Sequence, residues 1–139
     1  MMTAKELLIN QLEDAGYQLE KAYEGIDEST LDHRITKDAM TPRETLVHLS
    51  EAYYAVIEDA AGRQHEWGSY VAPDTSWPGL WKIASELRSK AVETTLSSPD
   101  GAMKAHAYII AHDYYHVGQV CLARLGCNSE WNAYAIYKG

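Results

Sequence analysis

Apolar residues recur at helical spacing in four segments of the chain, and polar residues fill the remaining positions of each segment. The first segment covers residues 3–24 and ends at Gly25. Its apolar side chains fall on one helical face: Leu8, Leu12, Ala15, Leu19 and Ala22. Residues 26–40 hold few apolar positions, so we predict a connector there with one short turn.

The second segment has the clearest helix start in the sequence. Thr41, Pro42 and Glu44 place a hydroxyl at the N-cap, a proline at the first helical position and a carboxylate at the third. This pattern is a capping box, in which the Thr and Glu side chains bind backbone N–H groups that the helix itself leaves unpaired. Gly62 ends the helix, and its apolar face comprises Leu49, Ala52, Tyr53, Val56 and Ala60.

A long connector precedes the third helix. Residues 63–78 are rich in Gly, Pro, Ser and aromatic residues, and they are too many for a tight turn between antiparallel helices. We therefore predict that this connector crosses the end of a bundle. The third helix begins at Thr75 or Ser76 with Pro78 in its first turn, and its core face comprises Leu80, Ile83, Ala84, Leu87 and Ala91.

The fourth helix follows a break at residues 97–101, runs over residues 103–125 and stops at Gly126. The tail, residues 131–137, is apolar enough to pack back onto the helices. No segment alternates with the period of a strand. We therefore predict an all-α fold, a four-helix bundle forming a single domain over residues 1–139, with a long crossover between the second and third helices.

Composition and charge narrow the function classes. The net charge of −8 argues against binding to nucleic acid or to an anionic membrane surface, because both need clustered cations. No apolar stretch is long enough to span a bilayer, and the start of the chain lacks the pattern of a signal peptide. We predict a cytoplasmic protein in which Cys121 and Cys127 are ordinary thiols.

The histidines carry the strongest chemical signal. His112 and His116 are four residues apart and project from one face of the fourth helix, which suits two ligands of one metal ion. Such a pair alone is a weak signal, because two core histidines bonded to Tyr would look the same. His48 lies beside the apolar face of the second helix and provides a third inward imidazole. A shared cation would satisfy all three nitrogens, and the remaining alternative is a bundle with three buried histidines and no ion.

The segments TPRETLVHLSEAY and IIAHDYYHVGQVCLARLG together resemble the two signatures of the DinB/YfiT-like metalloprotein superfamily. The resemblance covers nearly the whole chain, and the Gly118-Gln119 pair after His116 makes it more specific. It implies an up-down-down-up four-helix bundle that is a homodimer. It also implies that His48, His112 and His116 hold one divalent metal ion, with nickel or zinc favoured over other metals.

Three histidines leave a coordination position open for water or substrate, as in catalytic metal sites. The resemblance favours a metal-dependent S-transferase acting on a small molecule, with a low-molecular-weight thiol as a substrate, over a hydrolase. The alternative is a non-catalytic metal- or ligand-binding bundle, a stress-associated dimer. No catalytic residue is assigned.

Several further residues have two interpretations. Glu51 is a hydrogen-bond partner of His48 or a general base, or else a solvated helix acid. Gln119 orients a ligand or fixes helix packing, and Tyr53 and Tyr115 supply hydroxyls near the ion or belong to the core. The remaining histidines are predicted to be surface groups: His33, His65 and His106.

Overall fold

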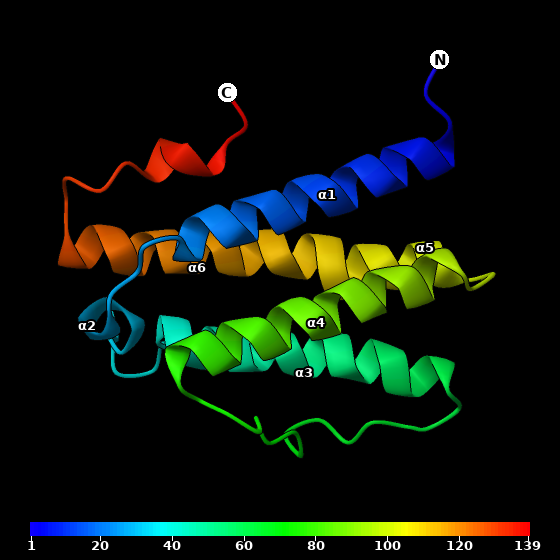
Figure 1. The fold of residues 1–139 in the computed structure, drawn as a ribbon, viewed down its shortest axis with the longest axis horizontal. Helices are drawn as coiled ribbons and strands as arrows, with labels where there is room; N and C mark the ends of the chain where they lie inside the picture. The colour runs from blue at the N-terminus through cyan, green and yellow to red at the C-terminus, as the bar shows by residue number, and fades with distance from the viewer. The chain divides into compact units, whose positions relative to one another are not determined.

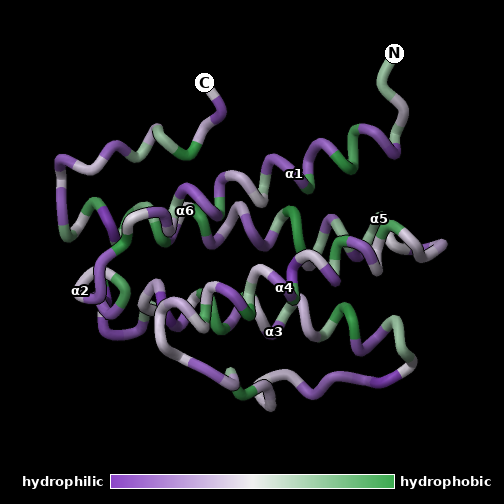
Figure 2. The backbone as a smooth tube through the Cα atoms, viewed as in Figure 1, coloured by the Kyte–Doolittle hydropathy of each residue, from purple (hydrophilic) through white to green (hydrophobic).

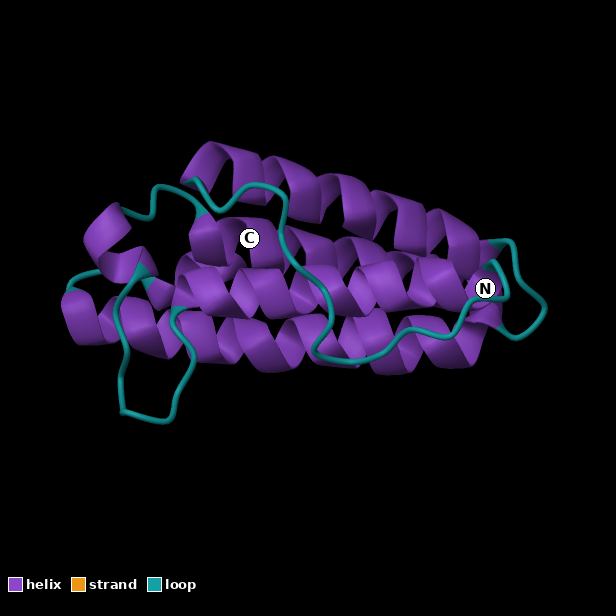
Figure 3. Ribbon diagram, turned by 90° about the horizontal axis from the view of Figure 1, so that it is seen from below, coloured by secondary structure: helices purple, strands orange, loops and turns teal.

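The computed structural model describes residues 1–139, and all of its regular structure is helical (Figures 1 and 3). The elements in order are α1 (Ala4–Tyr23), α2 (Glu28–Leu31), α3 (Pro42–Ala60), α4 (Trp77–Leu96), α5 (Gly101–Lys104), the π-helix η1 (Ala105–Ile110), α6 (Ala111–Cys127) and the 3₁₀-helix η2 (Ala133–Ile136). The all-α prediction is confirmed. No helix combines the length and the apolar character that crossing a membrane requires.

The contacts between residues divide the chain into two compact units. One comprises Met1–Thr45 with Asp113–Gly139, and the other comprises Leu46–His112. Both divisions fall inside a helix, so α3 and α6 each contribute residues to both units. The single domain expected over residues 1–139 stays a prediction.

In the first unit, α1 buries the face that the apolar spacing predicts. Leu12, Ala15, Leu19 and Ala22 are all buried and Leu8 is half-buried. Figure 2 shows hydrophobic and hydrophilic residues alternating along the helix. A capping box at Thr3 starts α1, and Gly25, at a positive φ of 69°, follows its end.

The end of α1 is joined to α6 by one half-buried cation. The guanidinium of Arg124 donates hydrogen bonds to the carbonyl oxygens of Ala22 and Glu24, which the end of the helix leaves unpaired. The ring of Trp131 lies 4.5 Å from the Arg124 guanidinium carbon. The following segment η2 packs on α1, and Ile136 is buried, so the prediction that the tail packs back is confirmed.

The start of α3 has the capping box that the sequence predicts. The Thr41 hydroxyl accepts a hydrogen bond from the Glu44 N–H, and the Glu44 carboxylate accepts one from the Thr41 N–H. Arg43 binds Asp32 and Glu28, which attaches α2 to this start. The short turn predicted within residues 26–40 is α2.

In the second unit, α3 and α4 contribute buried apolar faces, and the connector of residues 61–76 joins them (Figure 1). A backbone contact sets the turn from α4 to α5, because a Cβ on Gly101 would lie 1.6 Å from the Thr95 carbonyl oxygen. The predicted fourth helix is α5, η1 and α6 in succession, and α6 runs one residue past Gly126, to Cys127.

Candidate metal centre

Helix α3 positions His48 through its apolar face. Leu46 and Leu49 are fully buried, and they enclose Val47 and His48 in the sequence. His48 itself is half-buried. The histidine therefore lies at the edge of the core, where its ring can meet another side chain and still be reached by solvent.

Helix α6 positions the other two histidines one turn apart. His112 is half-buried and His116 is 2% exposed. The π-helix η1 ends directly before α6 and contains Ile109 and Ile110, both buried. A π-type turn contains one residue more than an α-helical turn. It therefore rotates the face on which His112 and His116 lie relative to the buried residues that precede them in η1.

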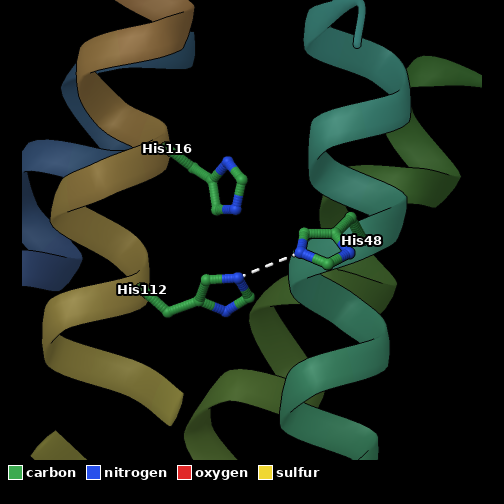
Figure 4. A group of neighbouring side chains, drawn as sticks. All are labelled: His48, His112 and His116. Carbon is green, nitrogen blue, oxygen red and sulfur yellow. Dashed lines mark hydrogen bonds between the residues drawn. The ribbon is translucent and has the colours of Figure 1, made fainter. Parts of the chain in front are cut away.

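The three imidazoles come together (Figure 4). The Nε2 atoms of His48 and His112, both within Leu46–His112, are 3.0 Å apart, and their rings are nearly perpendicular, at 82°. His116 follows His112 by one turn of the same helix. One ring nitrogen from each residue can be chosen so that all three lie within 4.8 Å of one another. The predicted set of residues is therefore brought together.

Gln119 orients the most buried of the three rings. Its Oε1 lies 2.6 Å from Nδ1 of His116, so Nδ1 carries the proton and Nε2 keeps its lone pair. Metal-bound histidines commonly have such a partner on the second nitrogen, because it fixes the tautomer and the ring orientation. Of the two interpretations of Gln119, the structure supports the one in which it orients a ligand.

The donor set fits a divalent cation. Two imidazole nitrogens that face each other can share one proton at most, whereas a cation accepts a lone pair from each of them. Bonds of about 2.0–2.1 Å in a tetrahedral arrangement place ligand nitrogens roughly 3.3 Å apart. This value lies between the 3.0 Å that separates His48 from His112 and the 4.8 Å limit of the group, so His48, His112 and His116 could hold a metal ion.

Glu51 is not a solvated acid, and its hydrogen bonds go to partners other than His48, so these two interpretations are wrong, while a role as general base stays a prediction. It is 9% exposed, and its Oε2 accepts hydrogen bonds from Nε2 of His65 at 2.9 Å and from the backbone N–H groups of Gly68 and Tyr70. Burial opposes ionisation, but these hydrogen bonds together outweigh it and lower the pKa of Glu51 below its ordinary range. Glu51 thus holds the connector of residues 61–76 against α3.

The prediction of a surface position is wrong for His65, whose side chain is 7% exposed, and holds for His106, whereas His33 is half-buried. Tyr53 is fully buried, as its core interpretation requires, whereas Tyr115 is 65% exposed and touches the His116 ring edge-on. Sequence reasoning also missed Asp113, whose carboxyl is fully buried directly after His112. In the sequence, the sign of a role near the histidines was the position of this acidic residue between His112 and His116.

Comparison of the chain with models of protein families, with curated proteins and with solved structures gives no match. The resemblance to the DinB/YfiT-like superfamily therefore stays a prediction. The same holds for the small-molecule substrate, the homodimer and the cytoplasmic location.

Proposed function

We propose that the chain binds one divalent metal ion, nickel or zinc, through His48, His112 and His116, and that it is a metal-dependent enzyme acting on a small molecule. The observation that supports this is the convergence of three imidazoles from two helices. We further propose a four-helix bundle of up-down-down-up topology, as the resemblance to the DinB/YfiT-like superfamily implies.

A divalent ion with three imidazole ligands keeps a position for an exchangeable ligand and lowers the pKa of water or of a thiol bound there. The chain supplies the conditions for this. Gln119 keeps the Nε2 lone pair of His116 available, and the half-buried positions of His48 and His112 leave the group within reach of solvent. We favour transfer of a thiol to an electrophile over hydrolysis.

The first test is metal content of the tag-free protein by elemental analysis. We expect near one ion per chain, and loss of it in a His112→Ala, His116→Ala double variant. The matched control is His106→Ala, because His106 lies exposed in the neighbouring π-helix. A parent that is empty and also refuses nickel, zinc and manganese would contradict the metal proposal.

A second experiment, on the same parent and double variant, addresses the reaction class. The protein reconstituted with cobalt is titrated with glutathione, and its visible absorption bands are followed. We expect glutathione to shift the bands, with no shift in the double variant. A site that binds cobalt but responds to no low-molecular-weight thiol would retain the metal proposal and remove the S-transferase.

A further inference from the structure

A cavity of about 240 Å³ lies in the unit Leu46–His112, among α3, the connector of residues 61–76 and the stretch from Lys104 to Tyr108. None of the three histidines of the candidate metal centre lines it. A cavity of roughly 150 Å³ accommodates benzene, so this cavity has room for one aromatic ring or two small fused rings.

Two aromatic side chains give the cavity flat walls. The rings of Trp67 and Tyr108 are nearly parallel, at 17°, with their centroids 6.4 Å apart. Both residues line the cavity and are about half exposed, Trp67 at 51% and Tyr108 at 42%. Their faces therefore give the cavity two aromatic surfaces on which a flat ring can stack.

A third lining residue, His65, can offer a hydrogen-bond acceptor. His65 lines the cavity, and its ring stands at 83° to the ring of Trp67. Because the Glu51 carboxylate accepts from Nε2 of His65, Nε2 carries the proton and Nδ1 is left as an acceptor. No hydrogen bond of the structure involves this Nδ1, so it is available to a ligand that donates an N–H.

The charges at the cavity balance each other. Lys104 and Asp59, which both line it, form an ion pair, and the remaining polar lining residue, Gln64, is neutral. The cavity therefore has no surplus cation for an anionic ligand, and the chain as a whole carries a net charge of −8. These features favour a ligand that is flat, uncharged and a hydrogen-bond donor.

We propose that this cavity binds a flat nitrogen-containing aromatic molecule of one or two rings, which stacks on the aromatic faces of Trp67 and Tyr108 and donates an N–H to Nδ1 of His65. This site is independent of the proposed metal centre, since no metal ligand takes part. The Glu51–His65 hydrogen bond presets the acceptor, and the two aromatic faces provide stacking area.

Isothermal titration of the full chain with indole tests this, because indole has a ring N–H and does not ligate metals through it. We expect one indole per chain, and weaker binding by about five- to a hundredfold in Trp67→Ala and in Tyr108→Ala, as lost stacking on an aromatic side chain predicts. Tyr134→Ala, at a tyrosine that is 80% exposed, is the matched control and should bind as the parent does.

The hydrogen bond is tested on the ligand, which avoids any question of folding. We expect 1-methylindole, which has no N–H, to bind about tenfold more weakly than indole, and His65→Phe to bind the two equally. Absence of indole binding, equal binding of both ligands by the parent, or unchanged binding in Trp67→Ala would each overturn the proposal. So would loss of indole binding in the His112→Ala, His116→Ala variant with the fold intact.

Discussion

Helix α3 carries two polar side chains about one turn apart, and each of them meets a histidine in a different way. His48 faces another imidazole, with 3.0 Å between its Nε2 and that of His112. Glu51 faces the imidazole of His65 at 2.9 Å and also accepts from two backbone N–H groups. A carboxylate can accept hydrogen bonds from several neighbouring N–H groups at once. Two imidazole nitrogens that face each other can share only one proton, and a cation can bind the lone pairs of both.

This difference assigns the two clusters different tasks. The Glu51 cluster fixes an irregular connector and presets one acceptor on His65, so it contributes to folding whether or not a ligand is present. In the cluster of His48, His112 and His116, a bound ion would supply the interaction that joins all three rings. Stability measurements and metal-binding measurements should therefore separate them.

The largest expected effect on stability comes from Glu51→Ala. The substitution leaves the N–H groups of His65, Gly68 and Tyr70 without their acceptor in a partly buried setting, so we expect the free energy of unfolding to fall by about 3 kcal/mol. Urea denaturation at pH 7 measures it. Glu86→Ala, at an exposed acid paired only with Lys82 on the same helix, should cost less than about 0.5 kcal/mol.

Equal losses in Glu51→Ala and Glu86→Ala would show that the Glu51 cluster contributes no more than a surface ion pair. Metal content sharpens the same comparison. If the two clusters are independent, Glu51→Ala keeps the metal content of the parent. A loss of metal in this variant would show that metal binding depends on the Glu51 cluster.

The two clusters also differ in how far sequence could predict them. His48, His112 and His116 lie on helices whose faces follow from apolar spacing and from the capping box at Thr41, so their inward direction could be predicted. Glu51 and His65 are fourteen residues apart, with an irregular connector between them, and no periodicity relates them. Their contact depends on the path of that connector, which the sequence does not reveal.

The ends of two helices are marked in the sequence by glycine. Gly25 and Gly62 follow helices at positive φ, a conformation that glycine adopts without the strain of a Cβ, so these ends were predictable. The π-helix Ala105–Ile110 was not, because the residues AHAYII suit an α-helix equally well. It packs against α4, and such packing is tertiary information that the sequence does not contain directly.

The next effect in size concerns the histidine cluster itself. Gln119→Leu removes the acceptor at Nδ1 of His116, so the ring loses its fixed tautomer and orientation. We expect metal affinity to fall about ten- to a hundredfold, measured by competition with a chromophoric chelator. Gln119→Glu retains an acceptor and should stay close to the parent. An affinity unchanged in Gln119→Leu would mean that Gln119 serves helix packing.

The smallest expected effect is a dependence of the Glu51 cluster on pH. Hydrogen bonds from His65, Gly68 and Tyr70 hold the pKa of Glu51 below its ordinary value of 4.5 despite burial. A carboxyl whose pKa is lowered by folding adds stability above its unfolded pKa and loses it as the pH falls through the folded pKa. The parent should therefore exceed Glu51→Gln by roughly 1 kcal/mol at pH 7, since hydrogen bonds to an ionised acceptor are stronger than those to an amide.

Urea unfolding of the parent and of Glu51→Gln between pH 7 and pH 3 follows this difference. We expect it to stay constant down to about pH 5 and to shrink below 4.5, because the carboxyl then becomes neutral like the amide. A difference that persists undiminished to pH 3 would mean that shape and packing at Glu51 matter more than its charge. In that case the negative charge of Glu51 would not be what distinguishes its contact with His65 from the contacts among His48, His112 and His116.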